Sequence, residues 1–159
     1  MFEIREIKPG EHEFLFEMLY EAIYIPDGEE KLPRSVVNEP YLSKYVDDFG
    51  RQGDLAFVLT NKDQLIGAIW IRLFSEEEKG YGFVDASTPE LSMALKESYR
   101  GSGFGTQLIE TVFSKLKNNG VEKISLSVDK QNRAVRLYRR VGFEIFSEEG
   151  TAYTMVKKL

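Results

Sequence analysis

Apolar residues spaced three and four positions apart predict the helices of this chain. Such a spacing lines one face of a helix, and that face must be buried against a core. Pro40 interrupts or starts one helix, which is expected to begin at Ser35 or Tyr41 and to end near Phe49. Gly120 stands where a glycine commonly closes a helix. The other expected helices are Phe14–Ile23, Leu108–Asn119 with its periodic Ile109, Val112, Phe113 and Leu116, and the shorter Arg133–Arg140.

Short apolar or alternating runs between these helices predict the strands. Turn-forming residues 61–64 join two of the strands into a hairpin. The order of strands and helices is typical of an α+β fold with α/β/α layers, in which a mixed sheet carries helices on both faces. No boundary divides the sequence, so residues 1–159 are expected to form one domain. The expected strands are Phe2–Lys8, Asp54–Thr60, Leu65–Phe74, Glu90–Leu95, Val121–Val128, Gly142–Ser147 and Tyr153–Leu159.

Composition and charge argue against several classes of function. Of the 159 residues, 42% are hydrophobic and 30% are charged, which is ordinary for a globular protein. The net charge of −5 argues against general nucleic-acid binding. No apolar run reaches membrane-spanning length and no secretory signal is evident, so a cytoplasmic protein without membrane contact is expected. Because cysteine is absent and His12 is the only histidine, the sequence excludes a thiolate or histidine-rich metal site and a cysteine nucleophile.

One glycine-rich turn stands between an expected strand and an expected helix. Gly101, Gly103 and Gly105 follow the strand Glu90–Leu95 and precede the periodic stretch that begins at Leu108. Glycines allow a tight turn and the close approach of a ligand, and a helix N-terminus offers unpaired N–H groups and a positive dipole end. This combination indicates a phosphate-binding loop, although a plain tight turn is the alternative.

The spacing of the glycines decides between phosphate ligands. A dinucleotide fingerprint requires a glycine at the position of Thr106, and the Walker pattern requires Gly-Lys-Ser/Thr, which is absent. The pattern present is Arg/Gln-x-x-Gly-x-Gly, formed by Arg100, Gly103 and Gly105. It resembles the pyrophosphate loop of the GNAT superfamily of acyl-CoA-dependent N-acyltransferases.

A second motif, about thirty residues further on, strengthens this resemblance. In GNAT proteins the strand after the pyrophosphate helix leads to an asparagine, a short helix that carries a tyrosine, and Gly-Phe. The matching residues here are Asn132, Ala134, Tyr138, Gly142 and Phe143. The resemblance covers residues 54–159 and implies the GNAT fold, with a mostly antiparallel sheet, and acetyl-CoA as the acyl-donor co-substrate without a metal.

The resemblance also implies roles for individual residues. A bulge in the strand 91–95 would let its backbone pair with the pantetheine arm and polarise the thioester carbonyl. Tyr138 would be the general acid toward the leaving thiolate, and Glu90 is the candidate general base for direct attack by an amine. The basic residues Lys130, Arg133, Arg136, Arg139 and Arg140 suit the phosphates of coenzyme A. The expected donor-binding residues are Met93, Ala94, Leu95, Arg100, Gly101, Ser102, Gly103, Phe104, Gly105, Thr106, Asn132, Ala134, Leu137 and Arg140.

Several of these roles have structural alternatives. Glu90 is otherwise a surface glutamate at the edge of a strand, and Tyr138 a half-buried packing residue. The polar connection Ser75–Pro89 is either functional or a solvated loop. Acidic residues in 27–30 and 76–78 favour a cationic amine as acceptor, unless they serve only solubility.

The sequence therefore predicts an N-acetyltransferase that acts on a primary amine of a small molecule or a peptide. The competing hypotheses are an acyl-CoA-binding sensor without turnover and, less favoured, a nucleotide-binding module. No nucleic-acid or membrane partner is expected, and a homodimer is compatible with the sequence.

Overall fold

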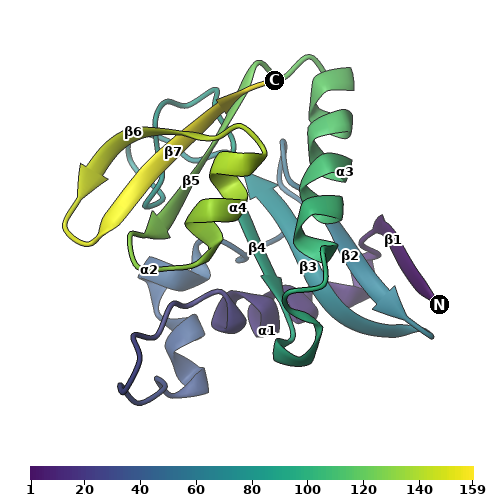
Figure 1. Cartoon of the computed structure of the whole chain (residues 1–159). Coiled ribbons are helices and arrows are strands. Elements are labelled where there is room, and N and C mark those ends of the chain that lie inside the picture. Colours follow the sequence, from purple (N-terminus) through teal and green to yellow (C-terminus); the bar gives the residue numbers. More distant parts are fainter.

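Seven strands form one sheet in the computed structural model, which describes residues 1–159 (Figure 1). The strands are β1 (Phe2–Glu6), β2 (Leu55–Asn61), β3 (Gln64–Arg72), β4 (Glu90–Leu95), β5 (Lys123–Asp129), β6 (Glu144–Glu149) and β7 (Ala152–Lys158). They are ordered β1-β2-β3-β4-β5-β7-β6, and only the neighbours β4 and β5 run parallel. The expected mixed and mostly antiparallel sheet is therefore confirmed.

Helices cover both faces of this sheet. The helices are α1 (Glu13–Glu21), α2 (Pro40–Ser43), α3 (Phe104–Asn118) and α4 (Ala134–Arg140), with short 3-10 helices η1 (Pro9–Glu11), η2 (Arg34–Asn38) and η3 (Glu97–Tyr99). Successive side chains of a strand point to opposite faces. In β3, Ile69 and Ile71 therefore join the core under α3 and α4, whereas Ala68 and Trp70 join the core under α1 and the segment after α2.

The helix expected from Ser35 or Tyr41 to near Phe49 is shorter in the structure, and Pro40 starts it. The 3-10 helix η2 comes first, and Pro40 then begins α2, which ends after one turn at Ser43. Proline forces this break because the residue before it is pushed into extended geometry, and Glu39 has φ −70° and ψ 135°.

Two buried side chains of β3 fix the chain after α2. Trp70 Nε1 donates to the Tyr45 carbonyl at 3.1 Å, and Arg72 Nη1 donates to the Lys44 carbonyl at 2.9 Å. Arg72 also pairs with Asp54 through contacts of 3.0 and 2.8 Å, and both of these side chains are buried. A buried guanidinium persists only when it is paired and hydrogen-bonded. The one charged residue in this apolar strand therefore anchors the backbone that carries Tyr45.

Candidate active site

The parallel strands β4 and β5 pair at one position only. Glu90 lies opposite Ser125, and the Ser125 N–H donates to the Pro89 carbonyl at 3.0 Å. Beyond this position the two strands diverge (Figure 1). A sheet that separates in its middle leaves part of the inner strand without a partner on one side.

Backbone groups of Met93 and Leu95 lie on that unpaired side. The Lys96 N–H donates to the Ile66 carbonyl at 2.9 Å, and hydrogen-bonded positions alternate along an antiparallel pair. The N–H and C=O groups of Met93 and Leu95 therefore point away from β3, toward the side that β5 has left. The expected bulge in β4 is wrong, because β3 and β4 pair without a register shift. Divergence of β5 is enough to expose this edge.

Six consecutive backbone N–H groups around the start of α3 have no partner in the protein. The hydrogen bonding of α3 begins with the Gln107 N–H, which donates to the Gly103 carbonyl at 3.3 Å, while residues 101–106 donate no backbone hydrogen bond. Gly101 and Gly103 have φ of +78° and +86°. Backbone of alternating handedness turns successive N–H groups toward a common point, and the helix dipole adds a positive potential there. This geometry suits a phosphate group.

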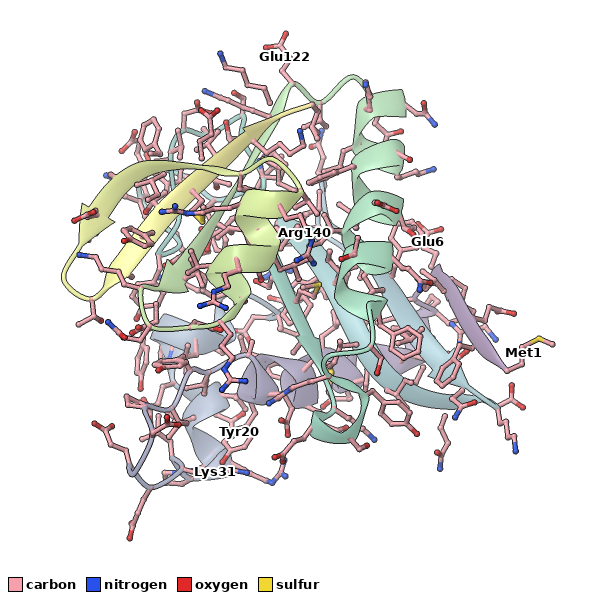
Figure 2. All side chains as sticks on the ribbon, in the orientation of Figure 1. Met1, Glu6, Tyr20, Lys31, Glu122 and Arg140 are labelled. Carbon is pink, nitrogen blue, oxygen red and sulfur yellow. The ribbon has the colours of Figure 1, made fainter.

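Gly105 has a packing role that sequence reasoning missed. A Cβ at this position would lie 3.0 Å from Leu137 Cδ2 and 3.4 Å from Met93 Cε. Its lack of a side chain therefore lets α3 approach α4 and β4 closely. Arg140 lies on the side of α4 that faces α3, and its Nη2 donates to Thr106 Oγ1 at 3.4 Å (Figure 2). The close packing thus brings a guanidinium beside the unpaired amides.

Arg100 is engaged by groups of the protein. Its Nη2 forms an ion pair with Glu21 Oε2 at 3.0 Å, and its Nε donates to the Leu95 carbonyl at 3.0 Å. These contacts tie the end of β4 to α1 and partly neutralise the guanidinium. The geometry therefore favours Arg140 over Arg100 as the cation beside the loop.

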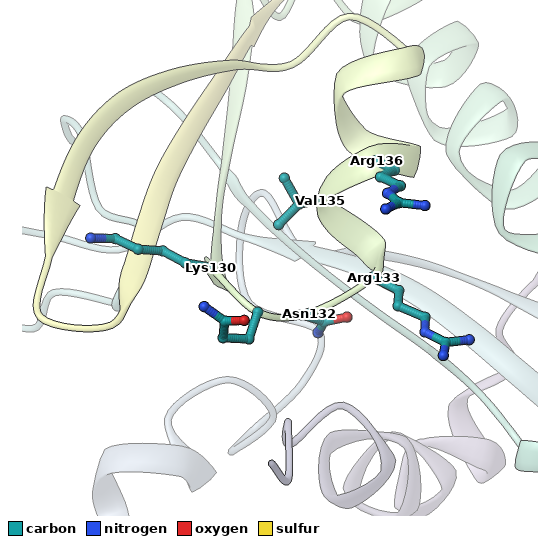
Figure 3. A pocket seen from close by; sticks show the side chains of 6 residues that line it. Lys130, Asn132, Arg133, Val135 and Arg136 are labelled. Atoms are coloured by element: carbon teal, nitrogen blue, oxygen red, sulfur yellow. The ribbon is translucent and has the colours of Figure 1, made fainter. Parts of the chain in front are cut away.

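A basic pocket lies at the start of α4. Asn132 Oδ1 accepts a hydrogen bond from the Ala134 N–H at 2.9 Å and so holds the beginning of the helix. Arg133 and Arg136 extend to the same side of α4, whereas Lys130 is directed away from them (Figure 3) and pairs with Glu148 at 3.1 Å. The pocket has a volume of about 500 Å³ and is lined by Lys130, Gln131, Asn132, Arg133, Val135 and Arg136. No acidic side chain lines it, so it favours an anionic group.

Tyr138 lies in the core under α3 and α4. Its ring packs edge-to-face on Phe143 with centroids 5.7 Å apart, and its hydroxyl makes no hydrogen bond with the protein. Burial raises the pKa of Tyr138 to about 12. The hydroxyl therefore keeps its proton over the physiological range and has no protein group to donate it to.

Glu90 is a buried carboxyl on the opposite face of the sheet, the face that Ala94 shares. Its Oε2 accepts a hydrogen bond from the Tyr45 hydroxyl at 2.6 Å, and its Oε1 accepts one from the Gly82 N–H at 3.0 Å. Burial raises the pKa of Glu90 to about 7, against the opposing effects of these two donors and of the Lys44 charge. A carboxyl with this pKa exchanges a proton readily at neutral pH.

The surroundings of Glu90 contain residues that sequence reasoning missed. Neither Tyr45 nor Gly82 belongs to a recognisable motif, and Tyr45 is 45 positions from Glu90. Ser125, opposite Glu90, has a buried hydroxyl without a hydrogen-bond partner in the protein. Part of the connection Ser75–Pro89 therefore closes over the carboxyl instead of forming a purely solvated loop.

We expect Gly82→Ala to lower the free energy of unfolding by about 2 kcal/mol. A Cβ at this position would lie 2.6 Å from the carbonyl carbon of Leu126, and backbone cannot give way as a flexible side chain can. Urea unfolding measures the effect. Gly10→Ala is the matched control, since a Cβ at Gly10 meets no atom within 4 Å. Equal stability of the two variants would contradict this close contact.

Comparison with known proteins gives consistent matches. The model of the acetyltransferase (GNAT) family matches residues 15–143. N-alpha-acetyltransferase 30 of Schizosaccharomyces pombe is 29% identical over 130 residues, which are 78% of this chain and 80% of that protein. The uncharacterized N-acetyltransferase YobR of Bacillus subtilis is 43% identical over 58 residues, which are 36% of this chain and 24% of YobR. The match thus spans about a quarter of the length of YobR.

Solved structures share the fold over the whole chain. The PaiA N-acetyltransferase from Thermoplasma acidophilum, crystallised in complex with coenzyme A, superposes with a TM-score of 0.74 at 23% identity. The superposition covers 100% of this chain and 99% of that protein. Separately, none of the helices described here has the length and apolar character required to cross a membrane.

Proposed function

Because the chain belongs to the acetyltransferase (GNAT) family, we propose that it transfers an acetyl group from acetyl-CoA to a primary amine of a small molecule or a peptide. The observation that carries this proposal is the row of unpartnered N–H groups in residues 101–106, next to the unpaired edge of β4. The row suits a pyrophosphate, and the strand edge suits an extended chain of amides such as the pantetheine arm.

In this proposal acetyl-CoA lies along a surface that runs from residues 101–106 to the unpaired edge of β4. Residues 101–106 bind the pyrophosphate, with Arg140 adding charge. The backbone of Met93 and Leu95 pairs with the pantetheine amides as a further strand would. Arg133 and Arg136 in the basic pocket suit an additional phosphate of coenzyme A. Asn132, Ala134 and Leu137 belong to the elements that border this surface.

The proposed chemistry is direct attack of the amine on the thioester. An alkylammonium must first lose a proton, and Glu90 takes it, directly or through water. The amine nitrogen then bonds to the carbonyl carbon, and the developing oxyanion is stabilised by a backbone N–H of β4. As the carbon–sulfur bond breaks, the thiolate receives a proton from Tyr138. The nitrogen loses its second proton to water as the amide forms, and water returns a proton to Tyr138. No acyl-enzyme forms in this scheme, since the chain has no cysteine.

Two observations bear on the acceptor. Acidic residues gather in 27–30 and in 76–78, and the second group belongs to the connection that reaches Glu90 through Gly82. A cationic amine is therefore the favoured acceptor class. The name of the fission yeast relative describes acetylation of an α-amino group, which makes peptides a reasonable part of a first acceptor set.

The test combines ligand binding with turnover. Acetyl-CoA, NAD and ATP are compared for their effect on the melting temperature, and acceptor amines are then screened by release of free thiol from acetyl-CoA. We expect a large shift with acetyl-CoA alone and thiol release with at least one amine. A shift with NAD alone would overturn the proposal, and acetyl-CoA binding without thiol release across the screen would favour the sensor hypothesis.

We expect Tyr138→Phe to lower the rate of acetyl transfer tenfold or more while acetyl-CoA affinity stays nearly unchanged. Phenylalanine preserves the ring that packs on Phe143 and removes only the hydroxyl. Single-turnover kinetics is the appropriate measurement, because slow product release can hide a slower chemical step. Tyr153→Phe is the control tyrosine substitution. A wild-type single-turnover rate in Tyr138→Phe would make Tyr138 a packing residue and leave protonation of the thiolate to water.

A further inference from the structure

We propose that Tyr45 is a positioning residue, whose hydroxyl orients the Glu90 carboxylate and joins it to the loop residues Tyr81 and Gly82. The inference rests on the proposed function, in which Glu90 is the general base. Tyr45 comes after α2, Glu90 begins β4, and Tyr81 and Gly82 belong to the connection between β3 and β4. Three separate parts of the chain thus meet at one carboxyl group.

The direction of each hydrogen bond in this group is fixed. The Tyr81 N–H donates to the Tyr45 hydroxyl oxygen at 2.7 Å, and an amide can only donate. An ionised carboxylate can only accept, so the Tyr45 hydroxyl donates to Glu90 Oε2, which lies 2.6 Å from the hydroxyl oxygen. The Gly82 N–H donates to Oε1 at 3.0 Å. Both oxygens of the carboxyl face donors, an arrangement that favours the ionised form.

The position of the Tyr45 hydroxyl is itself determined by buried contacts. Its carbonyl accepts the hydrogen bond from Trp70, and its ring packs edge-to-face on Phe74 with centroids 5.0 Å apart. The Tyr81 ring is parallel to it at 6.4 Å. Tyr45 is only 6% exposed, so it has little freedom to turn its hydroxyl away from Glu90.

Lys44 ties the same segments together a second time. Its Nζ donates to the Lys79 carbonyl at 2.6 Å and lies 5.0 Å from the centre of the Tyr81 ring. Two successive residues, Lys44 and Tyr45, therefore join the segment after α2 to the β3–β4 connection. Glycine is needed where this connection passes Glu90, because a Cβ at Gly80 would collide with Glu90 Oε1.

The charged and titratable groups around Glu90 predict the effect of removing the Tyr45 hydroxyl. Lys44 contributes a positive charge, the Arg72 guanidinium of β3 is already paired with Asp54, and Tyr45 and Tyr81 are neutral phenols with raised pKa values. Burial raises the pKa of Glu90, and the hydrogen bond from Tyr45 is the largest opposing effect. Without that bond the pKa of Glu90 should rise further, while the ring contacts persist.

The experiment is Tyr45→Phe, with Tyr41→Phe as the matched control because Tyr41 is 48% exposed and makes no hydrogen bond through its hydroxyl. The Glu90 carboxyl is titrated by ¹³C NMR in protein labelled at glutamate and assigned by its absence in Glu90→Gln. The acid limb of kcat/KM is recorded on the same samples. We expect both pKa values to rise by about one unit in Tyr45→Phe and to stay unchanged in Tyr41→Phe.

The NMR pKa tests whether Tyr45 positions Glu90, whereas the acid limb of kcat/KM tests whether Glu90 is the general base. An unchanged NMR pKa of Glu90 in folded Tyr45→Phe overturns the positioning role. A raised NMR pKa with an unchanged acid limb supports the positioning role and removes Glu90 from catalysis. If Tyr45→Phe does not fold, 3-fluorotyrosine incorporated at Tyr45 keeps the ring and makes the hydroxyl a stronger donor. The Glu90 pKa must then fall below the wild-type value, and a constant pKa overturns the inference.

Discussion

Glu90→Gln is expected to lower turnover at pH 7 by about a hundredfold or more and to leave acetyl-CoA affinity nearly unchanged. Glutamine retains an oxygen that can accept one hydrogen bond, from Tyr45 or from Gly82, but it cannot take a proton from the amine. The wild-type kcat/KM should rise with pH through an acid limb near 7, because the carboxylate is the active form and burial holds the pKa of Glu90 at about 7. The variant should lack this limb.

The control for Glu90→Gln is an acid outside the site. Glu144 of the edge strand β6 is exposed and forms no hydrogen bond or ion pair through its side chain, so Glu144→Gln should retain both the wild-type rate and the acid limb. An acid limb that persists in Glu90→Gln would clear Glu90 of the role. Ser92 acting with water, or the acids in 76–78, would then be the next candidates.

Stability gives a readout of the Glu90 pKa that does not depend on activity. The folded-state value of about 7 exceeds the ordinary value of 4.5, so the folded protein binds more protons than the unfolded chain between these pH values. The free energy of unfolding must then fall as pH rises through this window, by roughly 3 kcal/mol from this group alone. Urea unfolding at several pH values measures this fall. In Glu90→Gln the free energy of unfolding should decrease less over the same pH range.

Gly103→Val is expected to raise the Kd for acetyl-CoA by about a hundredfold or more, because several charge-assisted N–H contacts would be lost together. Gly103 has φ +86°, a conformation that a β-branched residue avoids. The residue must change its backbone angles to accept valine, and the row of N–H groups in 101–106 then no longer converges. We expect a modest loss of stability of about 1–2 kcal/mol. Calorimetric titration with acetyl-CoA measures the affinity, and circular dichroism checks the fold.

The matched control is Gly120→Val, at the other end of α3. Gly120 has φ +80°, and a Cβ there meets no atom within 4 Å, as is also true of Gly103. The two substitutions therefore carry the same conformational penalty, and only one of them alters the amide row. Equal affinities of the two variants would contradict the phosphate-binding role of the loop. Gly105→Val is less informative, because its Cβ would meet Leu137 whether or not a ligand binds.

Local signals in the sequence determined most of the fold and the outline of the site. The predicted strand Glu90–Leu95 has the bounds of β4, and the periodic stretch ending at Asn119 corresponds to α3 within one residue at its C-terminus. These predictions succeed because apolar periodicity, glycine and proline act on residues close together in the chain. The two GNAT motifs have the same local character, and the family assignment they predicted is confirmed. The roles of individual site residues remain predictions.

The tertiary structure alone decided which groups surround those residues. The sequence predicted a helix from Ser35 or Tyr41 to near Phe49, but α2 begins at Pro40 and ends at Ser43. Trp70 and Arg72 hydrogen-bond the carbonyls of the residues that follow it. Tyr45, in the segment after α2, meets Glu90 from 45 positions away, and burial raises the pKa of the carboxyl. Arg100 likewise meets Glu21 from 79 positions away. Such contacts depend on how sheet and helices pack, and no pattern of neighbouring residues encodes them.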